Sequence, residues 1–341
     1  MKDIINLQKK IMPEMIELLN KRYNILRTVY YNSPIGRRTL ANSLGIGERA
    51  IRTEVDILKK QGLLEVKSMG MNVTEVGINI IDDLKEFIYE LRDLSILEEK
   101  LKKILNLKNI YVVPGDFDND QYILSDIGKE ASKHILNTIN DNNILGITGG
   151  TTMAEVANNM PNVHNLKDIL VLPARGGIGK DLKTQSNNIA AKIAEKLNGS
   201  YKLLHIPDNI GKEALDTLMK FDEIKSLIDS IKKIDVLVFG IGRADTMAER
   251  RNLSEDIIDS LRTNKAVSEA FGYYFDTFGN IVRESNTVGL NLKDFKRIKN
   301  VIGIAAGAKK SEAILAITAL RNDLTLIVDE GAARSILKKV K

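Results

Sequence analysis

Apolar and polar residues follow two different patterns along the chain, and the change between them falls near residue 105. Before it, apolar residues recur at helical spacing; after it, short apolar runs alternate with helical stretches. Several of these runs are almost wholly apolar, as in strands that are covered on both faces. The pattern predicts a helical N-terminal part and a C-terminal α/β domain, doubly wound and Rossmann-like, with a mainly parallel sheet.

The N-terminal part has the element order of a winged helix-turn-helix. An apolar face at Ile51, Val55 and Leu58 marks its last helix, and Gly62 ends that helix. A three-residue turn at 45–47 precedes it. The predicted elements are helices over residues 14–31, 37–44 and 48–61 and hairpin strands over 63–66 and 71–74. We therefore expect a winged helix-turn-helix DNA-binding domain over residues 1–74.

Charge is distributed unevenly between these parts. Residues 1–74 contain 13 Lys or Arg and 7 Asp or Glu, a net charge of +6, whereas the whole chain carries +5 and the remainder therefore −1. A basic excess confined to the N-terminal fifth favours an anionic polymer as its partner. A basic face that only aids solubility is the alternative.

The predicted third helix turns arginine and threonine away from its apolar face. Arginine can bond guanine edges bidentately, whereas basic residues beside the helix suit backbone phosphates. We expect base contacts from Arg49, Arg52 and Thr53, and phosphate contacts from Arg37, Arg38 and Lys67. Double-stranded operator DNA is the expected partner, with protein contacts as the alternative use of the motif. Gly47 stands at the N-cap, where Ser or Thr usually holds the first turn better.

Residues 75–105 lack proline and keep apolar residues near a 3–4 spacing, which predicts one long connecting helix. Glu98 interrupts the apolar stripe, so a regular coiled coil is not expected. Two uses remain open for this segment. It joins the two domains and helps dimerisation, or it packs on its own C-terminal domain.

The run from Ile144 to Thr152 predicts a strand, a tight turn and the start of a helix. Such a turn presents backbone N–H groups at the positive end of the helix dipole, which suits a phosphate. Gly149 and Gly150 allow a ligand to approach the main chain, and Thr151 and Thr152 add hydroxyl donors. The sequence therefore predicts a phosphate-binding loop here.

Further strand ends in the predicted C-terminal domain, residues 106–341, carry glycine together with Arg, Lys, Gln and Thr. In open parallel sheets, ligands bind beyond the carboxyl ends of the strands. Loops at 173–177, 240–243 and 305–310 together indicate a site for a polar, multiply anionic small molecule. The predicted strands are 110–113, 144–148, 169–173, 203–206, 236–239, 301–305 and 324–328.

Specific motifs strengthen this interpretation: Gly149–Thr152, Pro173–Gly177, Met247–Arg251, Glu269–Phe275 and Asp329–Ala333. They resemble the SorC family of bacterial sugar-responsive repressors, and the N-terminal part is similar to DNA-binding domains of the DeoR and SorC type. The resemblance implies a tetrameric repressor of central glycolytic genes whose operator binding responds to fructose-1,6-bisphosphate. It also implies an effector domain similar to sugar-phosphate isomerases and deaminases.

The same resemblance assigns roles to individual residues. It places phosphate on Gly149, Gly150, Thr151, Thr152 and Lys310. It places the other end of the ligand on Arg175, Gln185 and Arg250, with Glu269 accepting bonds from sugar hydroxyls. Which phosphate meets which group stays open. Arginine forks, a lysine point charge and a hydroxyl-orienting carboxylate suit such a ligand chemically.

Composition narrows the remaining possibilities. The chain has no cysteine, which fits a reducing cytoplasm, and no apolar run approaches the ~18 residues of a membrane span. The N-terminus lacks a signal-peptide core, and no His, Asp or Glu spacing suggests a metal site. We expect a cytoplasmic homo-oligomer, a dimer or a tetramer, with neither cofactor nor membrane partner.

The same predicted sheet would also suit an enzyme. The alternative interpretation is a sugar-phosphate isomerase or deaminase that carries a DNA-binding domain. Proton transfer needs a carboxylate or histidine above the sugar. The three histidines, His134, His164 and His205, lie outside the glycine-rich loops. Glu269 is the candidate base without an evident acid–base partner, and the Asp329–Gly331 turn could supply further carboxylates. We therefore expect a regulator.

Overall fold

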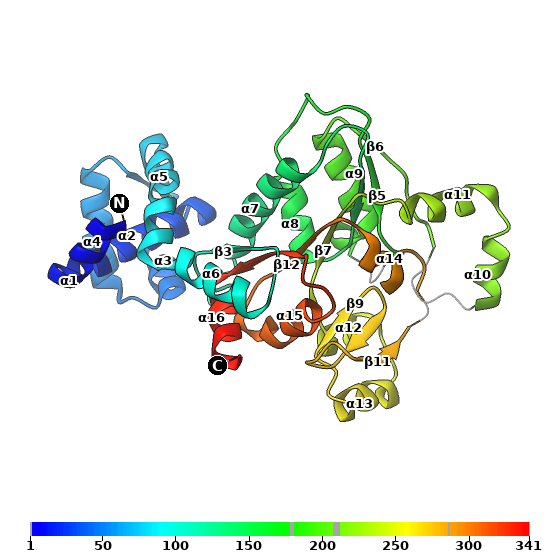
Figure 1. The fold of residues 1–341 in the computed structure, drawn as a ribbon. Helices are drawn as coiled ribbons and strands as arrows, with labels where there is room; N and C mark the ends of the chain where they lie inside the picture. Colours follow the sequence, from blue (N-terminus) through cyan, green and yellow to red (C-terminus); the bar gives the residue numbers. More distant parts are fainter. Residues whose placement is uncertain (1, 178–180, 207–211, 286, 341) are drawn as a thin grey trace. The chain divides into compact units, whose positions relative to one another are not determined.

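The computed structural model describes residues 2–177, 181–206, 212–285 and 287–340. The chain divides into two compact units, residues 1–95 and 96–341, and each is described by itself (Figure 1). The prediction of an N-terminal DNA-binding fold followed by a doubly wound α/β domain is confirmed.

The first unit is a winged helix-turn-helix. Leu40, Ile51 and Val55 are buried where the two helices of the motif meet. Ile35 pairs with Met71 through two backbone hydrogen bonds, of 3.1 and 2.8 Å, and so adds a third segment to the wing. The predicted turn and hairpin are present. The unit begins with a helix over Lys2–Ile11 that was not predicted. The elements are α1 (Lys2–Ile11), α2 (Pro13–Asn32), α3 (Arg37–Leu44), α4 (Glu48–Lys60), β1 (Leu64–Lys67), β2 (Gly70–Val73) and α5 (Glu75–Leu91).

The prediction of one long helix over residues 75–105 is wrong. Helix α5 ends at Leu91, α6 (Leu94–Ile104) begins three residues later, and Asp93 between them has a left-handed φ of 55°. The apolar face of α5 is buried in the core of the first unit. In the second unit, Glu98 of α6 accepts the Val112 N–H at 2.7 Å. The residue that interrupts the apolar stripe therefore satisfies an edge-strand amide.

The second unit is built on a seven-stranded sheet in the order β3-β13-β12-β7-β4-β5-β6, and all its pairs are parallel. Parallel strands buried on both faces require apolar sequences, which explains the apolar runs. The strands are β3 (Asn109–Val113), β4 (Ile144–Ile147), β5 (Leu170–Pro173), β6 (Ser200–Tyr201), β7 (Val236–Gly240), β12 (Asn300–Ala305) and β13 (Thr325–Asp329).

The strand predicted over residues 203–206 is wrong, because β6 lies earlier, at Ser200–Tyr201. The segment 203–206 is irregular, and Leu204 and Ile206 are nevertheless buried. The side-chain amide of Asn187 serves as its hydrogen-bond partner. It accepts the Leu204 N–H at 2.9 Å and donates to the Leu204 carbonyl at 3.1 Å. A side chain thus substitutes for the strand pairing that an apolar run suggests.

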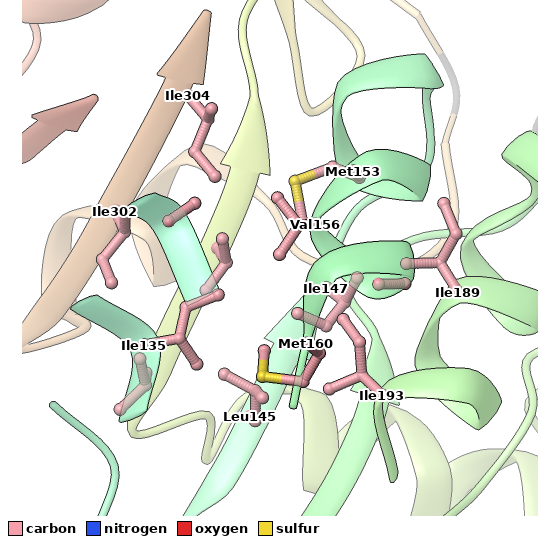
Figure 2. Packing of buried hydrophobic residues seen from close by; sticks show 14 of the residues in the cluster. Ile135, Leu145, Ile147, Met153, Val156, Met160, Ile189, Ile193, Ile302 and Ile304 are labelled. Atoms are coloured by element: carbon pink, nitrogen blue, oxygen red, sulfur yellow. The ribbon is translucent and has the colours of Figure 1, made fainter. Parts of the chain in front are cut away.

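One face of the sheet is covered by α7 (Ile123–Thr138), α8 (Thr151–Asn159) and α9 (Ser186–Lys196). Figure 2 shows this core: Met153 and Val156 of α8 and Ile189 and Ile193 of α9 pack near Ile147 of β4. Burial of a large aliphatic side chain contributes roughly 1.5–3 kcal/mol. The packing fixes α8 against the strand that precedes it.

A second, antiparallel sheet has the order β11-β10-β9-β8. Near it, Phe239, Phe271 and Phe295 form a buried aromatic cluster with ring centroids 4.9–5.6 Å apart. The remaining elements are η1 (Leu182–Thr184), α10 (Lys212–Leu218), α11 (Asp222–Ile231), β8 (Gly242–Arg243), α12 (Ala244–Arg250), α13 (Glu255–Thr263), β9 (Ser268–Ala270), β10 (Tyr273–Phe275), β11 (Ile281–Glu284), α14 (Leu292–Arg297), η2 (Ala308–Lys310), α15 (Ser311–Thr318) and α16 (Glu330–Lys339).

Candidate functional site

The strand order reverses between β4 and β7, since the chain runs from β4 to β5 on one side and from β7 to β12 on the other. Such a switch point is where open α/β sheets bind ligands. The Thr148 hydroxyl oxygen accepts the Gly240 N–H at 3.1 Å and joins the ends of these two strands. The predicted phosphate loop begins at this junction.

The loop Gly149–Thr152 is fixed by the segment before α9. A Cβ on Gly149 would lie 2.7 Å from the Thr184 carbonyl oxygen, so this position requires glycine. The Gly150 N–H donates to the same oxygen at 2.9 Å. That amide is therefore used within the protein, and the first turn of α8 presents N–H groups that a ligand can use. Thr151 there is exposed and Thr152 is buried.

The same segment holds the loop after β5. The Ser186 hydroxyl donates to the Arg175 carbonyl at 3.0 Å. A Cβ on Gly177 would lie 2.4 Å from Gln185 Oε1, so the Gln185 side chain lies directly against this loop. The segments that carry Gln185 and Arg175 therefore lie beside the loop Gly149–Thr152.

Glu269 lies on β9 and is buried, with 3% of its surface exposed. Its Oε1 accepts from Arg175 at 2.9 Å, from Arg251 at 2.9 Å and from the Gly272 N–H at 2.8 Å. Burial alone raises the pKa of this carboxyl, but the charges of Arg175 and Arg251 outweigh burial and hold the pKa below its ordinary value. Glu269 therefore stays ionised and links β9 to the loop after β5.

Arg251 is the group that the sequence analysis missed. Its side chain is 1% exposed, whereas the neighbouring Arg250, the last residue of α12, is exposed. Both arginines stand in the motif Met247–Arg251, which was the available signal. Sequence alone did not distinguish which of the two would be buried.

Lys310 and Arg250 form a second cationic group near the same edge. Burial, followed by the charge of Arg250, lowers the pKa of Lys310 from 10.5 to about 8. Lys310 ends η2 immediately before α15, and Arg250 is adjacent in sequence to Arg251, which binds Glu269. Two groups of phosphate-suited side chains thus belong to one unit.

The other acid–base candidates have structural surroundings. His134 stacks on Tyr111 at 3.6 Å and contacts Glu130, while His164 and His205 lie in irregular segments. Asp329 is the N-cap of α16. Within the described ranges, no group of three or more His, Cys, Asp or Glu residues is arranged to hold a metal ion. Likewise, none of the described helices has the length and apolarity to cross a membrane.

The predicted DNA-contact residues lie on or beside α3, α4 and the wing. Arg38, Arg49, Arg52, Thr53 and Lys67 are exposed, and the half-buried Arg37 lies 3.5 Å from Asp56. Lys67 pairs with Glu65 at 2.7 Å. Gly47 is the N-cap of α4 and supplies no side-chain bond, as expected.

The orientation of α4 depends on a buried carboxylate that sequence analysis did not single out. Glu54 accepts from Lys21 at 3.0 Å and from Arg22 at 2.8 Å, both on α2. Burial raises its pKa, but these hydrogen bonds and charges outweigh burial and lower it. These ion pairs connect the buried side of α4 to α2 and so fix the orientation of the exposed face of α4.

Comparison with known proteins gives matches to both units. The family "Putative sugar-binding domain" matches residues 89–338, and "CggR N-terminal DNA binding domain" matches residues 18–88. The chain is 38% identical over 338 residues to the central glycolytic genes regulator of Bacillus subtilis, covering 99% of each chain. It is 39% identical over 339 residues to the protein of that name from Priestia megaterium, again covering 99% of each.

Solved structures share the fold. The putative SorC family transcriptional regulator from Enterococcus faecalis has 36% identity and a TM-score of 0.67, over 71% of this chain and 99% of that one. The full-length sorbitol operon regulator SorC from Klebsiella pneumoniae has 18% identity and a TM-score of 0.67, over 89% of this chain and 94% of that one.

A DNA-binding winged helix-turn-helix followed by a sugar-binding α/β domain defines the class of transcriptional regulators of the SorC type. Within this class, the chain belongs to the family of the central glycolytic genes regulators.

Proposed function

We propose that this protein represses central glycolytic genes and that a phosphorylated sugar, fructose-1,6-bisphosphate, modulates its binding to operator DNA. The observation that carries the proposal is the pair of phosphate-suited groups in the second unit. One is the loop Gly149–Thr152 with Arg175 and Gln185, and the other contains Arg250 and Lys310. A sugar with two phosphates has two anionic ends for such groups.

We assign one phosphate to the loop of Gly149, Gly150, Thr151 and Thr152, with Arg175 and Gln185 beside it; the two glycines leave room for the phosphate, and the first turn of α8 supplies N–H donors. Arg250 and Lys310 take the other phosphate. Glu269 Oε1 already accepts three donors, so we assign the sugar hydroxyls to its Oε2 atom. Arginine supports this division because its planar fork can bind a phosphate bidentately.

The exposed face of α4 recognises the operator sequence, and Arg49, Arg52 and Thr53 contact the bases. We propose that Arg37, Arg38 and Lys67 contact the phosphate backbone. A homo-oligomer, a dimer or a tetramer, presents these helices to half-sites along one face of the duplex. The protein acts in the cytoplasm, where it meets both DNA and sugar phosphates.

The decisive experiment selects the bound sequence from a random duplex pool and then measures its affinity by fluorescence anisotropy. Fructose-1,6-bisphosphate should change operator affinity by roughly 5–150-fold, the range of a coupling of about 1–3 kcal/mol. Arg250→Ala should weaken sugar-phosphate binding in calorimetry while operator binding without ligand persists. Unchanged affinity and cooperativity at saturating ligand would refute the proposed switch.

An isomerase or deaminase on the same sheet is the competing function. The charges of two arginines hold Glu269 in its ionised form, which supports positioning over proton transfer. Incubation with phosphosugars, followed by NMR, tests this alternative directly. Turnover that is lost in Glu269→Gln would favour the enzyme.

A further inference from the structure

Asp329 connects three segments at the carboxyl edge of the sheet. It is fully buried at the end of β13. Its Oδ2 accepts the Phe117 N–H at 2.7 Å and the Gly307 N–H at 2.9 Å, while Oδ1 accepts the Ala332 N–H at 3.0 Å. One carboxylate therefore fixes the loop after β3, the turn after β12 and the start of α16.

The turn after β12 carries Lys310. Gly307 has a φ of 98°, and its carbonyl accepts the Lys310 N–H at 3.0 Å. On its outer side, Asp118 accepts the Lys309 N–H at 3.0 Å. A Cβ on Gly307 would lie 2.9 Å from Asp118 Oδ1. The turn is thus held between two carboxylates, and Asp118 directly follows Phe117, which Asp329 binds.

We propose that Asp329 is a positioning residue of the effector site, which places the ammonium group of Lys310 for a ligand phosphate through the Gly307–Lys310 turn. Asp118 supports the turn from its other side. This inference rests on the proposed function, since it assigns a role within the same site. It extends the site to a residue that need not touch the ligand.

Charges around Lys310 give this role a measurable signature. Arg250 and Arg243 lower the pKa of Lys310, whereas Asp329 and Asp118 raise it. Burial raises the pKa of the Asp329 carboxyl to about 6, and the charge of Asp116 adds to this effect. Neutralising Asp329 should therefore move the deprotonation of Lys310, and the alkaline loss of phosphate binding, to lower pH. A residue that stabilised the fold without acting on Lys310 would leave the alkaline loss of phosphate binding at the same pH.

The test is a double-mutant cycle on the full chain, read by calorimetric titration with fructose-1,6-bisphosphate from pH 7 to 10. Asp329→Asn and Lys310→Ala are made singly and together. Asp276→Asn is the matched control, because its carboxylate also accepts backbone amides, from Phe278 and Asn280. That turn belongs to the β10–β11 hairpin, whose Gly279 packs beside Ala316 and Ala319 at the far end of α15.

Asp329→Asn should weaken binding about tenfold or more, because small displacements of a charged group are costly. In the Lys310→Ala background the same change should cost less than about twofold, since coupled residues are not additive. The single variant Asp329→Asn should lose binding at a lower alkaline pH than the wild type. Asp276→Asn should match the wild type. Equal losses in both backgrounds, with the alkaline loss of binding at an unchanged pH, would overturn the inference.

Asp118→Asn provides an independent variant if Asp329→Asn does not fold. It should weaken binding less, by about threefold, and only when Lys310 is present. No change in affinity and an alkaline loss of binding at an unchanged pH for Asp118→Asn would count against the positioning role. A wild-type protein that binds no sugar phosphate at any pH would instead overturn the proposed function itself.

Discussion

Lys310 provides a strong test of the proposed effector site, because its protonation is expected to control phosphate binding between pH 7 and 9. Burial and Arg250 lower its pKa to about 8 in the free protein. A bound phosphate would raise this pKa, so binding above pH 7 should be accompanied by proton uptake. Sugar phosphates themselves have a second pKa near ~6, so their charge is constant in this range.

The expected magnitude follows from the fraction of Lys310 that is protonated. With a pKa of about 8, that fraction falls from about 90% at pH 7 to about 10% at pH 9. If only the ammonium form binds, the dissociation constant rises about tenfold, equivalent to about 1.4 kcal/mol. The arginines of the site keep their charge throughout this range, because guanidinium groups are not deprotonated in proteins.

Calorimetry in two buffers of different ionisation enthalpy measures both the affinity and the proton uptake. Lys310→Arg is the matched control, because a guanidinium keeps its charge and should give an affinity independent of pH. Superimposable profiles for the two proteins, or an affinity that rises toward pH 9, would show that Lys310 does not bind the phosphate.

Further predictions concern the buried charges and the DNA contacts. Glu54→Gln should lower the unfolding free energy by about 1–3 kcal/mol in urea denaturation at pH 7. Because the folded state lowers the Glu54 pKa, this difference should shrink as pH falls below 4.5. Arg251→Leu should cost about 3–5 kcal/mol, since Glu269 loses a buried partner; an unchanged urea midpoint would contradict this. Arg52→Ala should relax sequence preference by about 1–3 kcal/mol, whereas Lys67→Ala should weaken all duplexes and reduce the salt slope by about one. Anisotropy titrations over a salt series separate these two effects.

Elements defined by local signals could be predicted from the sequence. Helix α3 has the predicted bounds, and α4 ends one residue before its prediction, because glycines and apolar periodicity mark both ends. The glycine-rich strand ends likewise identified the loops around Gly149 and Arg175, which the structure brings together through Thr184 and Ser186. A ligand site is expected at the carboxyl edge because the sheet is parallel. The alternation of predicted strands and helices is what indicates a parallel sheet.

Features that depend on packing could not be predicted. Apolar periodicity continues across Asp93, so it did not reveal the left-handed residue that separates α5 from α6. Near β6, the Asn187 side chain forms hydrogen bonds with the Leu204 backbone, and a local sequence pattern does not predict such a distant partner. Adjacent helical residues differ by about 100° in direction, so only the tertiary structure distinguishes buried Arg251 from exposed Arg250.

The buried carboxylates Glu269 and Asp329 of the sugar-binding domain have a shared physical role that connects the fold with the proposed function. Glu269 holds Arg175 and Arg251, and Asp329 holds the turn of Lys310. Cations fixed by such partners keep their positions without a ligand, so binding requires little ordering of side chains. The same bonds keep these carboxylates occupied by donors, whereas acid–base catalysis needs a group that exchanges protons with the substrate. A sheet of this type therefore supports recognition of an anionic sugar when its acidic residues orient its basic ones.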